Sequence, residues 1–259
     1  MIDAHIHLEQ YSDEDIAAMA AEAEKDGIQG LVAVSMNLES CLRTAELAAR
    51  YPALVKPAYG FHPEQPVPAA AELDRLLAWI RRHAGAMTAV GEIGLPYYLR
   101  SEKEQAGEHF ELQPYIEVLE RFLALAAELD KPVVLHAVYE DAEVVCGLLE
   151  KHRIERAHFH WFKGPEKTVR RMAERGYFIS FTPDILYEEE IRGLAHMYPP
   201  ELVMAETDGP WPFEGPFEGQ PTHPRMIHSA ARAWAEIHGW TYEEACLRLE
   251  ANTRSFYRI

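Results

Sequence analysis

The segment MIDAHIHLEQYSDEDIAAMAAEAEKDGIQGLVAVS (residues 1–35) holds a complete strand, helix and strand pattern. An apolar run at residues 1–8 precedes a helical stretch at 13–27, which has acidic residues in its first turn and Gly27 at its end. A second apolar run, rich in β-branched residues, follows at residues 30–35. Such alternation favours parallel strands that are joined by a helical crossover.

The same alternation continues to the end of the chain. Six further candidate strands lie at residues 55–62, 88–95, 132–137, 156–162, 177–183 and 202–208. Helical stretches lie at residues 38–51, 70–85, 116–130, 140–152, 164–176, 188–198, 224–239 and 241–257. This repetition matches a (β/α)8 barrel, and the glycine-rich phosphate loop of an open doubly wound sheet does not follow the first strand. The sequence therefore predicts a single TIM-barrel domain over residues 1–259.

The composition is acidic, with 25 Lys and Arg residues against 42 Asp and Glu residues and a net charge of −17. This charge argues against broad electrostatic capture of nucleic acid, although a local basic rim or a metal pair can still bind a phosphate. No apolar run reaches the roughly 20 residues that cross a bilayer, and no signal-peptide pattern is visible. We therefore expect no membrane association and no obligate protein partner.

The three cysteines, Cys41, Cys146 and Cys246, are odd in number and far apart. They match neither a disulfide framework nor a zinc cluster, because both need paired spacings. Reduced thiols of this kind are typical of cytosolic proteins. The sequence therefore predicts a cytoplasmic protein.

Histidine and acidic side chains gather where the expected strands end. They are His5 and His7 at the first strand, Glu92 at the fourth, His136 at the fifth, His158 and His160 at the sixth, and Asp208 at the eighth. Active sites of barrel enzymes lie at this C-terminal end of the strands. Imidazoles and carboxylates are ligands for zinc, manganese or similar metals. Four of these histidines, with one Glu and one Asp, already exceed a single tetrahedral site and suit two ions that share a bridging carboxylate.

Each residue also has a plainer interpretation. A strand-end histidine such as His136 is more often a hydrogen-bonded polar residue than a ligand. Glu92 could cap a following helix, and Asp208 could be an N-cap before Gly209. The joint pattern favours a metal site, because buried acids and imidazoles are costly unless they are paired or metal-bound. Asp3 shares the face of the first two histidines one layer deeper, so we expect it to orient them or fill the barrel floor.

Seven motifs together resemble the TatD family of metal-dependent hydrolases, which belongs to the amidohydrolase superfamily. In chain order they read HIHL, GFHP, AVGEIGLPYY, KPVVLHA, HFHWFKG, ETDGPW and NTRSFY. The resemblance implies a (β/α)8 barrel, two divalent metal ions (zinc, manganese or magnesium) and hydrolysis, with deoxyribonuclease activity attributed to several members.

The resemblance also implies roles for individual residues. His5, His7 and Asp208 would bind one ion, His136 and His160 the second, and Glu92 would bridge the two. Two metals can activate a water and polarise the substrate. Asp208 could then take the proton of that water and pass it to the leaving group, so that Asp208 and Glu92 are the expected catalytic residues.

Two further histidines lie near these ligands. His158 lies one layer below His160 and is interpreted as a core or supporting residue. His62, in the GFHP motif, is the next candidate for contacting substrate. Its alternative is a capping histidine before Pro63.

The chain departs from the family pattern at residues that bear on substrate. Pro96 replaces the Asp of the usual GLDYY motif, and Ala137 and Val138 replace Ser and Arg of HSRDA. The segment PTHP, with Thr222 and His223 before Pro224, replaces a common Arg-Asn-Glu-Pro. Because Arg suits forked phosphate contacts, its loss removes one reason to expect a phosphodiester. Lys163 could supply a cation instead, or could be a solvated loop residue.

The loop after Asp208 is rich in aromatic residues. Trp211, Phe213 and Phe217 could stack over substrate, or could simply pack against one another within the loop. The acidic residues Glu214 and Glu218 in the same loop would repel a polyanion.

Three functions remain open from the sequence. A phosphodiesterase acting on nucleic-acid ends predicts a basic strip from Arg100, Lys103 and Lys163. A hydrolase of cyclic amides, lactones or carboxylic esters predicts an apolar-walled pocket from Tyr97, Tyr98 and Trp211. A metal-binding protein without catalysis is opposed by the presence of the two carboxylates. The first function is expected, with the second as its alternative.

Overall fold

Eight parallel strands form a nearly closed barrel in the computed structural model, which describes residues 1–259. Their order around the barrel follows the order in the chain. The strands are β1 (Ile2–Ile6), β2 (Gly30–Ala33), β3 (Val55–Tyr59), β4 (Ala89–Gly94), β5 (Val133–His136), β6 (Ala157–Phe159), β7 (Phe178–Phe181) and β8 (Val203–Ala205). The predicted (β/α)8 barrel is confirmed.

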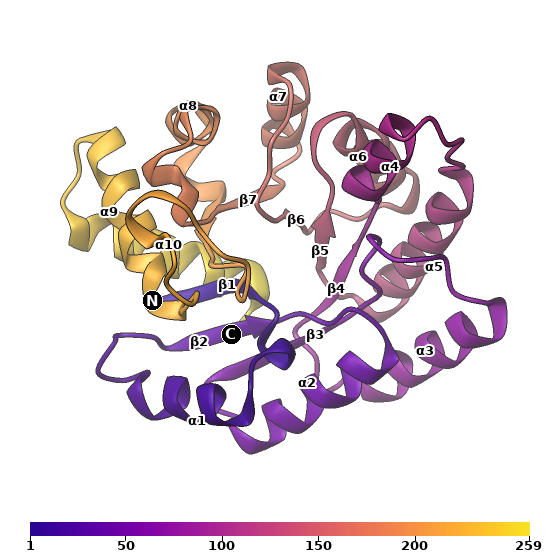
Figure 1. The fold of residues 1–259 in the computed structure, drawn as a ribbon, viewed down its shortest axis with the longest axis horizontal. Helices are drawn as coiled ribbons and strands as arrows, with labels where there is room; N and C mark the ends of the chain where they lie inside the picture. Colours follow the sequence, from indigo (N-terminus) through magenta and orange to yellow (C-terminus); the bar gives the residue numbers. More distant parts are fainter.

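Ten helices surround the strands (Figure 1). They are α1 (Asp13–Glu22), α2 (Leu38–Arg50), α3 (Ala70–His83), α4 (Tyr97–Gln105), α5 (Gln113–Leu129), α6 (Tyr139–His152), α7 (Glu166–Glu174), α8 (Glu189–Met197), α9 (Ile227–His238) and α10 (Tyr242–Tyr257). A cluster of 60 buried residues fills the space between strands and helices. None of the helices combines the length and the apolar composition needed to cross a bilayer.

Buried side chains join β1 to the segment that follows β8. The amide of Asp208 donates to the carbonyl of His5 at 3.0 Å. One layer deeper, Thr207 donates to both carboxylate oxygens of Asp3, from its amide at 3.0 Å and from its hydroxyl at 2.5 Å. Asp3, which is fully buried, therefore links β1 to the segment that follows β8.

The end of the barrel opposite the strand termini is filled with apolar side chains. Phe256 and Tyr257, from the last turn of α10, pack with Ile2, Ala4 and other inward-facing residues in a second core of 10 buried residues. The hydroxyl of Tyr257 donates to the carbonyl of Ala4 at 3.2 Å. In Figure 1 the yellow helix α10 accordingly lies beside the indigo strand β1. The last turn of α10 thereby closes this end of the barrel.

Helix α4 was not predicted from the sequence. It contains no buried residue, and Pro96 at its N-cap makes no side-chain hydrogen bond. The carboxylate of Glu64, from the loop after β3, instead accepts the amides of Tyr98 at 2.9 Å and Leu99 at 2.6 Å. A cap that arrives from 34 residues away leaves no local signal for the start of a helix.

Several strands end earlier than the sequence predicted. β6 ends at Phe159 and β8 at Ala205, so that the following polar residues lie just beyond the ladder. Trp161 (φ 37°) and Asp208 (φ 48°) have left-handed backbone conformations. A strand cannot continue through such a conformation, and the chain therefore turns at the mouth of the barrel, meaning the C-terminal strand ends and the loops after them.

Candidate metal centre

Five imidazoles surround the carboxylate of Glu92, a fully buried residue of β4, and four of them lie within 3.2 Å of it. One oxygen, Oε2, lies 3.2 Å from Nε2 of His5 and 3.1 Å from Nε2 of His7. The other, Oε1, lies 3.0 Å from Nδ1 of His136 and 2.8 Å from Nε2 of His160. Each carboxylate oxygen therefore faces its own pair of histidines.

Asp208 completes the group on the side of the β1 histidines. Its Oδ1 lies 3.2 Å from Nε2 of His5 and 3.6 Å from Nε2 of His7. It does not cap a helix, because a turn rather than a helix follows it. The six residues predicted as ligands thus lie together at the mouth.

Strand geometry explains this convergence. His5 lies in β1 next to a register shift of the strand, and His7 follows the last residue of β1 directly, so both lie at the C-terminal end of this strand. Glu92 lies within β4 and faces inward, so the alternative interpretation of a helix cap is wrong. A Cβ at Gly94 would overlap the carbonyl oxygen of His136, so only glycine permits β4 and β5 to approach this closely.

Several of these buried polar atoms have no hydrogen-bond partner. They are both ring nitrogens of His5, Nδ1 of His7, Nδ1 of His160, Oε2 of Glu92 and Oδ1 of Asp208. Unpartnered buried polar atoms are uncommon in proteins and need a physical explanation. A cation coordinated by imidazole nitrogens and carboxylate oxygens supplies one, and this donor set suits zinc or manganese. The residues present therefore fit a metal centre.

The imidazoles of the cluster lower the pKa values of its two carboxylates, Glu92 and Asp208. Burial alone would raise the pKa of Glu92, but the neighbouring imidazoles, His62 and His160 foremost, hold that pKa well below its usual range. Burial likewise opposes ionisation of Asp208, whose pKa is nevertheless lowered by its close contact with His5. Both carboxylates therefore stay ionised at neutral pH, which is the form that binds cations.

His62 faces the same centre from the loop after β3. Its Nε2 lies 3.4 Å from Oε1 of Glu92, and its Nδ1 accepts the amide of Glu64 at 3.2 Å. The two interpretations of His62 are thus compatible, since one ring nitrogen stabilises the turn and the other points into the site.

His158 has a different environment from these histidines. Its Nδ1 lies 2.8 Å from the hydroxyl of Tyr257, and its Nε2 lies 2.6 Å from the hydroxyl of Ser180. Both ring nitrogens are engaged inside the barrel, as expected for a core residue.

Three glutamates behind the histidines were not found from the sequence. Glu9 lies 3.5 Å from Nδ1 of His7, and Glu206 lies 3.5 Å from Nδ1 of His160. Glu64 lies 3.0 Å from Nε2 of His136. Glu9 and Glu64 each stand two residues after a histidine of the site, and Glu206 two residues before Asp208. This repeated spacing is the signal that could have indicated them.

Of the three aromatic residues in the loop after Asp208, fewer lie near the centre than the sequence suggested. Trp211 is 57% exposed, and its ring packs edge-on against Trp161 with a centroid distance of 5.8 Å. Phe213 is buried and packs against Trp161 from within the loop, at 5.9 Å between ring centroids. Phe217 lines a separate groove together with Lys25 and residues of α9, so its expected place over the substrate is wrong. Trp211 remains available to a substrate.

The predicted basic strip does not form. Arg100 contacts Asp141 at 2.8 Å, and Lys103 contacts Glu108 at 2.7 Å. Lys163, whose side chain is 17% exposed, lies 3.9 Å from Asp184. Acidic side chains of the same chain therefore pair closely with Arg100 and Lys103, whereas Lys163 only approaches its nearest carboxylate.

The residues that depart from the family pattern have structural roles. Ala137 and Val138 are buried directly after β5. Pro96 precedes the first turn of α4, and the hydroxyl of Thr222 donates to the carbonyl of Trp211. None of these four residues offers a charged group to a substrate.

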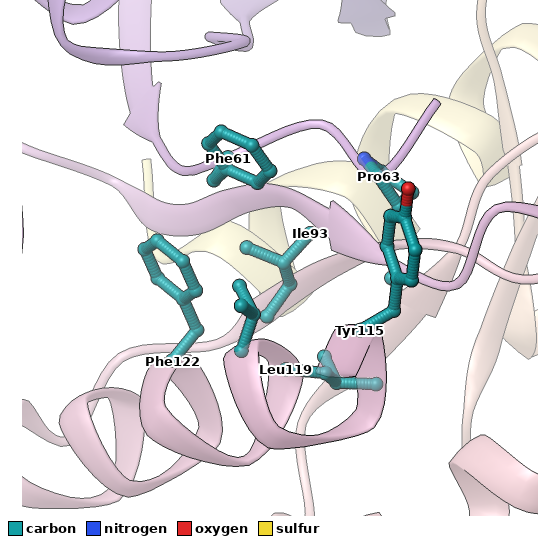
Figure 2. A pocket seen from close by; sticks show the side chains of 8 residues that line it. Phe61, Pro63, Ile93, Tyr115, Leu119 and Phe122 are labelled. Atoms are coloured by element: carbon teal, nitrogen blue, oxygen red, sulfur yellow. The ribbon is translucent and has the colours of Figure 1, made fainter. Parts of the chain in front are cut away.

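A small cavity of about 10 Å³ lies outside the barrel, between β4 and α5 (Figure 2). Phe61, Ile93, Leu119 and Phe122 are among its mainly apolar lining. Ile93 follows Glu92 and faces the opposite side of β4, toward α5. The cavity thus belongs to the packing behind the metal centre.

Comparison with known proteins places these features in a family. A family model described as "TatD related DNase" matches residues 2–258. An "Uncharacterized metal-dependent hydrolase" from Haemophilus influenzae is 38% identical over the whole length of both chains. Human "Deoxyribonuclease TATDN3" is 27% identical over all of this chain and 94% of its own. The crystal structure of YJJV, a TatD homologue from Escherichia coli K12, has a TM-score of 0.87 at 25% identity and covers 100% of this chain and 98% of the other.

Proposed function

The chain belongs to the TatD-related family of metal-dependent hydrolases, and from this membership we propose that it uses two divalent cations to hydrolyse phosphodiester bonds at nucleic-acid ends. The observation that carries the proposal is the division of Glu92, each of whose oxygens faces a different pair of histidines. A carboxylate so placed can bridge two cations at once.

The proposed ligands divide into two groups. His5, His7 and Asp208 would hold the first cation, and His136 and His160 the second, with Glu92 between them. When bound, such cations lower the pKa of a water and polarise the oxygen of the scissile group. The nitrogen and oxygen donors favour zinc or manganese over magnesium, which prefers oxygen ligands alone.

Asp208 is proposed to move the proton. Its carboxylate is ionised at neutral pH, because His5 and the other imidazoles hold its pKa low. It can therefore accept a proton from the attacking water at Oδ1 and deliver it to the leaving oxygen. His62, Lys163 and Trp211 are proposed to contact the substrate, since all three lie around the mouth.

The phosphodiester assignment is supported by the relatives. TATDN3 from Homo sapiens carries the name deoxyribonuclease, and this chain covers nearly all of it. We also propose a cytoplasmic location, which is supported by three free cysteines, two of them buried.

A second candidate is hydrolysis of a cyclic amide, lactone or carboxylic ester. The pairing of Arg100 with Asp141 and of Lys103 with Glu108 favours it, because a polyanionic substrate then meets few available cations. Tyr98 and Trp211, exposed by 53% and 57%, offer apolar surface beside the centre.

The test compares substrates and metals on the purified protein. After removal of bound metal, Zn²⁺, Mn²⁺ or Mg²⁺ is added, and turnover is measured on end-labelled DNA, bis(p-nitrophenyl) phosphate and panels of lactones and amides. We expect metal-dependent release of nucleotides from DNA ends, lost in Asp208→Ala and retained in Glu214→Ala, an exposed carboxylate of the same loop. Turnover of lactones or amides alone would establish the second candidate instead.

A further inference from the structure

Glu64 approaches one of the proposed ligands from outside the centre. It lies in the loop after β3, and its side chain is 17% exposed. Its Oε1 lies 3.0 Å from Nε2 of His136, whereas the carboxylates of Glu9 and Glu206 lie 3.5 Å from their histidines. Of these three contacts, only the contact of Glu64 has the geometry of a hydrogen bond.

His136 thus stands between two carboxylates. Its Nδ1 is 3.0 Å from Oε1 of Glu92, and its Nε2 faces Glu64. A neutral imidazole carries one proton, on either nitrogen. Only the tautomer with the proton on Nε2 leaves the lone pair of Nδ1 directed at the centre, and that tautomer requires an acceptor at Nε2.

The carboxylate of Glu64 is itself held in place. Oε1 also accepts the amide of Tyr98 at 2.9 Å, and Oε2 accepts the amide of Leu99 at 2.6 Å. These amides belong to the first turn of α4, where no side chain of the helix itself acts as a cap. Because both oxygens are engaged, the carboxylate cannot rotate away from His136 without uncapping the helix.

We propose that Glu64 is a positioning residue, which accepts the Nε2 proton of His136 and so directs Nδ1 of that imidazole toward the second cation. This role rests on the proposed two-cation centre. Outer carboxylates that hold a ligand histidine commonly change metal affinity by about 10–100-fold when they are removed. The sequence-distant contact also ties the ligand to α4, which carries Tyr97 and Tyr98 at the mouth.

The test is calorimetric titration of the metal-free protein with Zn²⁺. The wild type is expected to bind two equivalents. In Glu64→Ala the affinity of one equivalent is expected to fall about 10–100-fold, while the other, held by His5, His7 and Asp208, stays within about three-fold.

Glu64→Gln separates positioning from helix capping. The amide oxygen of Gln can still accept the proton of His136, but its NH₂ group cannot accept the amide of Leu99. Since that oxygen also still accepts the amide of Tyr98, we expect this variant to lose only part of the melting temperature that Glu64→Ala loses, while recovering at least half of the lost affinity on a logarithmic scale. Glu140→Gln is the matched control, because Glu140 is an exposed carboxylate of the mouth that contacts Arg100 and no ligand histidine.

The outcomes distinguish this role from the proposed function. Two equivalents in the wild type with unchanged affinities in Glu64→Ala would overturn the role of Glu64 and leave the two-cation centre intact. Equal losses of affinity in the Ala and Gln variants would show a structural role only, as would an equal loss in Glu140→Gln. Fewer than two equivalents in the wild type would overturn both. If Glu64→Ala does not fold, a loss above ten-fold in Glu64→Gln overturns the role, and a smaller loss supports it.

Discussion

Among single residues, Glu92 makes the largest number of contacts within the centre, because its two oxygens meet five imidazoles. The rings of His5 and His160 also stack directly on each other, with 3.8 Å between their centroids. The chemistry of Glu92 therefore decides whether one or two cations can be held.

Glu92→Gln is expected to lose at least one of two bound cations, because an amide keeps the shape but not the charge of a bridging ligand. The fall in kcat should exceed the roughly 100-fold that loss of an outer hydrogen-bond partner costs. Metal content after dialysis and turnover at saturating substrate measure both effects. Glu201→Gln, at an exposed position, is the control. Full activity with two cations would contradict a bridging role.

Asp184, which is not one of the proposed ligands, provides a test of how the stability of the fold depends on pH. Burial raises its pKa from 3.8 to about 6, although Thr182 and Trp161 donate hydrogen bonds to it. The folded protein therefore binds this proton more tightly than the unfolded chain does. The resulting stability is fully present below pH 3.8 and is lost as the pH rises through about 6.

Asp184→Asn removes that titration and keeps an oxygen for Trp161. Between pH 4 and pH 7 the wild type is expected to lose about 2 kcal/mol of unfolding free energy relative to the variant. Urea unfolding of both proteins at the two pH values gives the difference. Parallel pH profiles would show that Asp184 titrates normally.

Among the secondary-structure elements, β1 and β8 meet at the seam that closes the barrel. The amide and the hydroxyl of Thr207 donate to the fully buried carboxylate of Asp3, and backbone hydrogen bonds between His5 and Asp208 and between His7 and Gly209 accompany this pair. The histidines of β1 and Asp208 lie directly above this pair. The seam thus determines how the first proposed cation site is assembled.

Thr207→Val is expected to lower the unfolding free energy by about 1–3 kcal/mol, because Asp3 keeps its burial and loses its hydroxyl partner. Thr253→Val is the matched control at an equally buried threonine. The hydroxyl of Thr253 donates to the carbonyl of Leu249, one turn earlier in the same helix, so its loss should cost less than 1 kcal/mol. Equal losses of unfolding free energy in the two variants would mean that the hydroxyl of Thr207 contributes no more to stability than that of Thr253.

In the molecule as a whole, the proposed ligands come from β1, β4, β5, β6 and the segment after β8. Bound cations would therefore connect elements from both ends of the chain. Any ligand that binds only the folded state stabilises it by mass action.

Removal of metal with a chelator is accordingly expected to lower the melting temperature. Returning Zn²⁺ at 100 times its dissociation constant should restore about 2.7 kcal/mol. Differential scanning calorimetry measures the change, and His160→Ala should show a smaller one. A melting temperature that is independent of Zn²⁺ would contradict the centre.

The net charge of −17 and the internal pairing of Arg100 and Lys103 bear on DNA binding. Each phosphate neutralised on single-stranded DNA contributes about −0.7 to the slope of log K against log salt. With Lys163 as the proposed contact, we expect a slope of about −0.7 for Asp208→Ala with a single-stranded oligonucleotide, measured by anisotropy. A slope of about −4 or steeper would indicate a basic strip that the structure does not contain.

The fold and the histidine centre could be read from local patterns. Strand and helix alternation predicts the barrel, and the place of each ligand at a strand end follows from it, since parallel strands end on one side. Helix α4 could not be predicted, because its cap comes from Glu64. The roles of Phe217 and Arg100 were also beyond local patterns, since each depends on which loop or helix packs beside it.

Residue types and their spacing thus predict the barrel and the gathering of histidines and carboxylates at its strand ends, whereas the choice of six ligands is what the resemblance to the family implies. The barrel follows from the periods of strands and helices, which act over a few residues. Three other features arise only when distant segments meet. They are the contacts of the two Glu92 oxygens with different histidine pairs, the support of His136 by Glu64, and the pairing of Arg100 and Lys103 with carboxylates. Such contacts depend on distances and angles between side chains of different elements, and no local sequence pattern encodes them.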